Sequence, residues 1–205
     1  AKRKTEELGL KNIDYMQADI LKLKKIERKF DIIESSGVLH HLENPMAGWK
    51  VLTDCLKDSG LMRIGLYSEL ARQNIIQVRK EIIQLGIGSS DDEIKLFRTD
   101  IINSPKEHHK ELRNSSDFYS LSTVRDLLFH VKEHRFTIPQ LKQCLEELGL
   151  KFCGFENTNI LEKFRLSNTE SADPYNLDKW AVYEEVNPNT FAGMYQFWCQ
   201  KVAKK

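Results

Sequence analysis

The stretch from Phe30 to Leu42, with the sequence FDIIESSGVLHHL, constrains the fold of this chain more than any other. It begins with the mostly apolar, β-branched run 30–33, which is typical of a buried strand. The small residues 35–37 follow, and they let a ligand approach the backbone closely. Asn44-Pro45 then supplies an N-cap and a first helical position. A strand that ends in small residues and leads into a helix predicts one edge of a ligand crevice in an open α/β sheet.

Composition narrows the class of protein. The 205 residues suffice for one α/β domain with an elaboration, or for two small domains. A net charge of +1 provides no overall field that would attract nucleic acid or a membrane. We see no signal peptide and no apolar run of the roughly 18 residues that a membrane helix needs. The four cysteines show no CxxC spacing, so we expect reduced thiols, no metal site and a cytoplasmic protein.

Hydrophobic periodicity predicts alternating helices and strands at both ends of the chain, with a break between them. Residues 68–137 show helical patterns around 69–85, 90–98 and 121–134, separated by a polar stretch at 103–117, and are therefore predicted to be a helical insertion. The polar stretch 156–189 is expected to hold one short helix at 178–184. The remaining predicted elements are a helix at 2–8, strands at 12–18 and 30–34, a helix at 45–57, a strand at 61–67, a helix at 139–148, and strands at 151–155 and 195–202.

This order of elements, together with the stretch 30–42, resembles class I S-adenosylmethionine-dependent methyltransferases over residues 1–67 and 138–203. The resemblance implies an α/β, Rossmann-like sheet that lacks the family's first two strands and glycine-rich loop. It divides the chain into a partial methyltransferase core, 1–67 and 138–205, and a helical lid or acceptor-binding insertion, 68–137. Segments 117–155 and 191–198 also resemble a bacterial group often fused to tetratricopeptide repeats, although no such repeat is visible here.

The resemblance assigns the cofactor, S-adenosylmethionine, to two places. Asp19 would accept a hydrogen bond from the adenine amino group, for which an ionised carboxylate is suited, and Ile20 would offer its backbone N–H. Ser35, Ser36 and Gly37 would lie beside the methionine part. From the residues alone, the favoured interpretation is that Asp19 caps a turn at the end of its strand.

His40 and His41 occupy a position where the family often has a histidine pair near the transferred methyl group. Methyl transfer is an in-line displacement that depends largely on positioning, and a histidine can in addition take a proton from the acceptor. The alternative is that one ring packs in the core and the other faces solvent.

The segment from His130 to His134 matches H-x-x-E-H, an inverted zinc-protease motif, with both histidines on one face of the predicted helix. No clear third ligand follows, so no metal is assigned. We instead expect Tyr119, Arg125, His130 and His134 to bind the methyl acceptor; the alternative is that they are ordinary polar residues exposed to solvent. His108 and His109 fall in the polar stretch and receive no function.

The function that the resemblance implies is methyl transfer from S-adenosylmethionine to an unknown acceptor, impaired in this chain because the glycine-rich loop is missing. The alternative is an inactive interaction module that retains the fold. The sequence shows no basic-aromatic groove for nucleic acid. Without the first two strands, strand 30–34 would expose an unpaired edge. Either strand 12–18 or a second copy of the chain would cover it, and we favour the homodimer.

Overall fold

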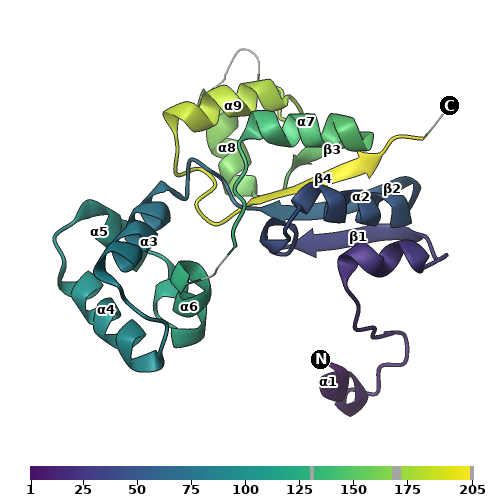
Figure 1. The fold of residues 1–205 in the computed structure, drawn as a ribbon. Helices are drawn as coiled ribbons and strands as arrows, with labels where there is room; N and C mark the ends of the chain where they lie inside the picture. Colours follow the sequence, from purple (N-terminus) through teal and green to yellow (C-terminus); the bar gives the residue numbers. More distant parts are fainter. Residues whose placement is uncertain (130–131, 168–171, 204–205) are drawn as a thin grey trace.

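The structure is a computed structural model that describes residues 1–129, 132–167 and 172–203. It has a four-stranded mixed sheet in the order β1-β2-β4-β3, with helices around it (Figure 1). β1 (Phe30–Ser36) and β2 (Leu56–Leu66) are parallel, while β4 (Tyr195–Lys201) is antiparallel to both β2 and β3 (Leu150–Phe155). The α/β fold class and the antiparallel pair of terminal strands are therefore confirmed.

The core lies between this sheet and the helices α2 (Pro45–Cys55), α7 (Ile138–Leu148), α8 (Thr158–Ser167) and α9 (Leu177–Val186). Trp49 on α2 and Trp180 on α9 are fully buried. The Trp180 ring stacks on Phe164 of α8 with centroids 3.8 Å apart. α8 was not expected, because it falls in the stretch 156–189 that was predicted to be mostly polar, and only one of its ten residues is buried.

The helix expected at 45–57 forms, and its start is as predicted. The Asn44 side chain accepts a hydrogen bond from the Ala47 N–H at 3.0 Å, and Pro45 takes the first helical position. The helix ends two residues early, at Cys55, since Leu56 already pairs with Phe30. The register then jumps to Ile32 with Leu61, so residues 58–60, which separate the predicted helix from the predicted strand, form an irregularity within β2.

The prediction of a strand at 12–18 is wrong. After α1 (Lys2–Glu7), residues 11–19 are exposed and form neither strand nor helix before the 3₁₀ helix η1 (Ile20–Lys25). A strand is stabilised by hydrogen bonds to a neighbour, and no described strand lies on the outer side of β1. α1 lies apart from the rest of the ribbon in Figure 1.

The carboxyl end of β1 points toward a separate group of helices, which we call the helical unit (Figure 1). The helical unit has its own apolar core, to which all of its helices contribute. This core includes the buried Val78, Phe97 and Val124. The polar stretch 103–117 was expected to lack helix, yet it contains α5 and η3. The elements of the unit are α3 (Gln73–Leu85), α4 (Asp91–Asn103), α5 (Glu107–Arg113), η3 (Ser116–Phe118) and α6 (Leu121–Phe129).

The last helix of the unit is shorter than predicted. α6 ends at Phe129, and residues 132–137 return to the sheet in an extended conformation. There the Phe136 N–H donates to the Tyr67 carbonyl at 2.9 Å, and the Glu69 N–H donates to the Phe136 carbonyl at 2.8 Å. Among the described residues, no helix is long and apolar enough to cross a bilayer.

Candidate active site

A cavity of about 450 Å³ lies where the carboxyl end of β2 meets the helical unit. One wall comes from Tyr67, which follows β2, and from Ala192–Met194, which precede β4. The opposite wall comes from α3, α5 and η3, and includes Ile75, Glu111 and Asp117. In an α/β sheet the carboxyl ends of parallel strands are where ligands bind, so this is the first place to look for chemistry.

The ends of β1 and β2 are held close to the loop before β4. The Gly37 N–H donates to the Gly65 carbonyl at 3.2 Å, and the Ser36 hydroxyl lies 3.7 Å from the Met194 sulfur. A Cβ at Gly65 would come within 2.6 Å of that sulfur. Gly65 is therefore required by close packing between two strand ends and a loop that are distant in the sequence.

Two features of the end of β1 suit a bound ligand: an unpaired buried hydroxyl group and a glycine in a left-handed conformation. Ser35 is buried, and within the described part of the chain its hydroxyl has no hydrogen-bond partner. Gly37 has φ of +73°, a left-handed conformation that favours glycine. Buried polar atoms are normally paired, so an unpaired one at a strand end is a place where a ligand can bind.

His40 and His41 form a pair against Tyr67. Their Nε2 atoms lie 3.1 Å apart, and the His41 Nδ1 atom lies 2.9 Å from the Lys132 carbonyl oxygen. Because a carbonyl can only accept, His41 Nδ1 carries a proton. In neutral His41 the Nε2 atom is then an acceptor, so His40 donates to it from its own Nε2. His40 is fully buried, with its ring centroid 4.1 Å from that of Tyr67.

Tyr67 lies between this pair and a buried arginine. The Arg72 guanidinium carbon is 3.6 Å from the Tyr67 ring centroid, a cation–π contact in which Arg72 is only 4% exposed. Burial raises the pKa of the Tyr67 hydroxyl, although the charge of Arg72 opposes the change. Tyr67 and Arg72 both line the cavity, so an aromatic face and a cation border it.

Glu133 holds Arg72 in place. Its carboxylate accepts from Arg72 Nη2 at 2.6 Å and from Arg79 Nη2 at 2.8 Å, while Arg135 Nη1 lies 3.8 Å away. Burial raises the pKa of Glu133, but the arginines outweigh burial and the net change is a lowered pKa. Glu133 is thus a buried carboxylate that organises one wall of the cavity.

Comparison with known proteins explains this architecture. Residues 1–64 match the family model described as a methyltransferase domain. Two solved structures of PKMT2 from Rickettsia typhi, one of them in complex with AdoHcy, superpose with TM-scores of 0.66 and 0.65. They are 14% and 15% identical to this chain, and each superposition covers 97% of this chain and 40% of the other. The chain has a class I methyltransferase fold.

A relative identified by sequence is likewise longer than this chain. An uncharacterized protein of Synechococcus sp. is 28% identical over 182 residues, which is 83% of this chain and 43% of the relative. The chain therefore spans about two fifths of the length of these relatives.

Within the methyltransferase fold, Asp19 lies where the chain enters η1. Its carboxylate accepts a hydrogen bond from the Leu21 N–H at 2.9 Å and so caps that 3₁₀ helix. Ile20 is partly buried and packs on the core near Gly48 of α2. The Asp19 side chain is exposed, so the cap leaves part of the carboxylate accessible.

Of the residues expected to bind the acceptor, the described ones, Tyr119, Arg125 and His134, do not line the cavity. The Tyr119 hydroxyl donates to the Arg113 carbonyl at 2.9 Å, Arg125 forms an ion pair with Asp91, and His134 is exposed near the start of α2. His130 lies outside the described residues. His134 lies in a segment that is not helical, so the expectation that the H-x-x-E-H histidines share one helix is wrong.

Sequence reasoning missed Tyr67, Arg72 and Glu133. Tyr67 was visible as the last residue of a predicted strand, which is a position where ligands are contacted in this class of fold. Arg72 and Glu133 carried no such signal, because their contact joins residues 61 positions apart.

Proposed function

We propose that this chain forms the reaction cleft of an S-adenosylmethionine-dependent methyltransferase and transfers a methyl group to an acceptor bound in the 450 Å³ cavity. The observation that carries the proposal is the coincidence of two findings. Residues 1–64 match the methyltransferase domain, and the cavity opens at the carboxyl end of β2, beside the end of β1. S-adenosylmethionine supplies an activated methyl group on a sulfonium, so the protein's contribution is chiefly to bind and orient.

Asp19 and Ile20 are proposed to hold the adenine end of the cofactor, and Ser35, Ser36 and Gly37 the methionine end. The chemistry of these residues suits that ligand. Ser35 offers a buried hydroxyl with no partner among the described residues, and Gly37 adds no side chain that would fill the space. The exposed Asp19 carboxylate can accept from an amino group while it caps η1.

His40 and His41 are proposed to act together. His40 is fully buried, so His41 is the member of the pair that is open enough to meet an acceptor. The hydrogen bond from His41 Nδ1 to the Lys132 carbonyl would fix the tautomer, and His41 Nε2 would take a proton from the acceptor after giving up its hydrogen bond from His40.

The helical unit, residues 68–137, is proposed to be the lid and acceptor-binding part. Tyr119, Arg125 and His134 would contact a large acceptor outside the cavity, while Tyr67 and Arg72 would contact the part that enters it. The chemical class of the acceptor stays open among small molecules, protein side chains and RNA. The four cysteines are all free thiols, which suits a cytoplasmic enzyme.

Cofactor binding tests the proposal. Saturation-transfer NMR with S-adenosylmethionine detects the weak binding expected of this chain, and Asp19→Ala should weaken it by about 10- to 150-fold, the worth of one hydrogen bond to a charged group. Asp14→Ala is the matched control, because Asp14 is an exposed acid on the same extended segment. Equal affinity in the two variants would remove Asp19 from the site. No binding at all in the unaltered chain would favour the alternative, an interaction module that retains the fold.

We also propose that the chain self-associates through β1. The outer edge of β1 has no described neighbour, Ile32 on it is 58% exposed, and residues 11–19 do not cover it. Unpaired strand edges pair readily with another chain, and here a second copy would supply the neighbour. Sedimentation at micromolar concentration should show a dimer that Ile32→Lys dissociates. A monomer in the unaltered protein would refute this.

A further inference from the structure

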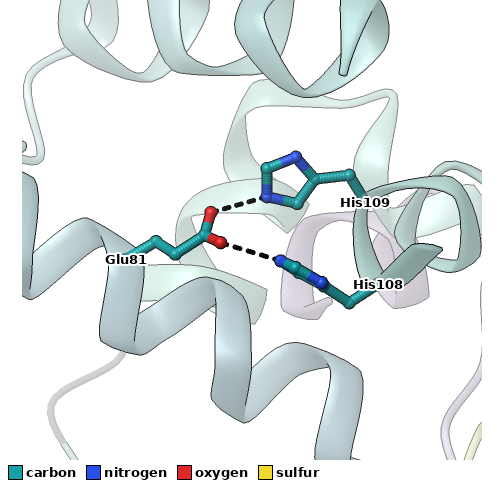
Figure 2. A group of neighbouring side chains, drawn as sticks. All are labelled: Glu81, His108 and His109. Atoms are coloured by element: carbon teal, nitrogen blue, oxygen red, sulfur yellow. Dashed lines mark hydrogen bonds and ion pairs between the residues drawn. The ribbon is translucent and has the colours of Figure 1, made fainter. Parts of the chain in front are cut away.

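Three side chains that can bind a metal ion converge inside the helical unit, away from the proposed cleft residues (Figure 2). Glu81 comes from α3, whereas His108 and His109 come from α5. Their ligand atoms all lie within 4.8 Å of one another. Within the described ranges, this is the only group of three or more His, Cys, Asp or Glu side chains with that geometry.

The convergence is unusual for neighbours on one helix. Successive residues of an α-helix point in directions about 100° apart and do not normally face each other. Yet the His108 and His109 rings have centroids 4.5 Å apart, and both Nε2 atoms reach the Glu81 carboxylate, at 2.8 and 2.7 Å (Figure 2).

The cluster is also largely shielded from water. The side chains of Glu81 and His108 are each 18% exposed and that of His109 is 6% exposed. Polar groups held in this way on two packed helices are preorganised, whereas charged residues on a solvated face are not. The arrangement therefore resembles a built site more than a surface ion pair.

The ligand set is one that zinc prefers. Two imidazole nitrogens and one carboxylate oxygen are common zinc ligands, with bonds of about 2.0–2.2 Å, and three protein ligands leave a fourth position open. Around a tetrahedral ion such ligands stand roughly 3.4 Å apart, so the Glu81–histidine contacts must open by about 0.6 Å. That is within the reach of small side-chain rotations.

The ammonium group of Lys106 already contacts the Glu81 carboxylate, where the metal ion would bind. The Lys106 Nζ atom lies 2.8 Å from Glu81 Oε1, and its side chain is 53% exposed. Because Lys106 is long and open to solvent, it can withdraw when a divalent ion takes the carboxylate. Lys106 would then act as a competitor that lowers the affinity for metal.

We propose that Glu81, His108 and His109 form a zinc site that ties α5 to α3. Both helices line the cavity, through Glu111 on α5 and Ile75 on α3, so an ion at this position would fix the cavity wall. Zinc binding does not depend on the proposed methyl transfer, and each can fail without the other.

Titration calorimetry of Zn²⁺ into the untagged, chelator-treated chain tests the site. We expect one ion per chain, and we expect Glu81→Gln to lower the affinity by at least about tenfold, since even outer contacts of metal ligands are worth 10- to 100-fold. Lys106→Ala should raise the affinity, because it removes the competing cation. The control is His134→Ala, an exposed histidine outside the cluster, which should bind as the unaltered chain does.

Two results would overturn the proposal. One is the absence of zinc binding in both the unaltered chain and Lys106→Ala, which would leave the cluster as a hydrogen-bonded brace between helices. The other is zinc binding that Glu81→Gln leaves unchanged while circular dichroism shows the variant to be folded, because the ion would then lie elsewhere.

Discussion

Replacing Glu133 by alanine should destabilise the protein more than any other single change to a charged residue near the cleft. Glu133 is 2% exposed by side chain and is the carboxylate around which Arg72, Arg79 and Arg135 gather. Removing one partner of a buried ion pair leaves an uncompensated buried charge, which costs roughly 3–5 kcal/mol.

In Glu133→Ala, one of the three arginine charges would be left buried without a carboxylate partner, and not all three. Arg79 also donates to the Leu127 carbonyl at 2.6 Å, and Arg135 also pairs with Glu69 at 2.9 Å. Arg72 is 5% exposed by side chain, and Glu133 is its carboxylate partner among the described contacts. The expected loss is therefore the value for a single pair, roughly 3–5 kcal/mol of a total that is about 5–15 kcal/mol for a typical domain.

Urea unfolding followed by circular dichroism measures this loss, provided that the slope with denaturant stays constant. Glu43→Ala is the matched control, because Glu43 pairs with Lys132, the residue next to Glu133, at an exposed position. That variant should unfold nearly as the unaltered protein does. Equal effects of the two substitutions would refute the reasoning.

The same carboxylate predicts a pH dependence. The pKa of Glu133 is lowered in the folded state from its ordinary 4.5, because the arginines outweigh the effect of burial. Its contribution to stability is therefore complete above pH 4.5 and is lost as the pH falls through the lower folded value. The free-energy difference between the unaltered protein and Glu133→Gln should shrink over that acidic range, and a constant difference would contradict this sign.

Three further predictions follow from close packing and burial. Gly65→Ala should weaken cofactor binding by displacing the side chains of Ser36 and Met194, whereas Gly193→Ala, which meets open space, should not; calorimetric titration of S-adenosylhomocysteine compares them. Trp180→Ala empties a fully buried site and should cost roughly 3–5 kcal/mol of unfolding free energy, measured in urea. Burial raises the pKa of Glu184 in the folded state above its ordinary 4.5. Protonated Glu184 therefore stabilises the folded state at low pH, and this stabilisation is lost as the pH rises through the folded-state pKa. Glu184→Gln should flatten that decline, and melting temperatures across the range test it.

Local patterns in the sequence determined those elements whose signals lie within a few residues of one another. The Asn44-Pro45 cap started α2 where expected, and Gly149 ended α7 in the left-handed conformation that favours glycine. The expected strands at 151–155 and 195–202 formed within one residue of their predicted bounds. Such elements were predictable because a cap, an apolar period and a stop act on neighbouring backbone groups.

Only the tertiary structure decided what depends on partners distant in the sequence. Residues 12–18 had the pattern of a strand but no described neighbour with which to pair, so they formed no strand and stayed exposed. His108 and His109 fall in a polar stretch of the sequence, and α5 places them against Glu81, which lies 27 residues before His108. Glu133 matches part of a zinc motif in the sequence, but the folded chain places it against Arg72. In each case a local pattern states what a residue can do, and long-range packing selects which partner it meets.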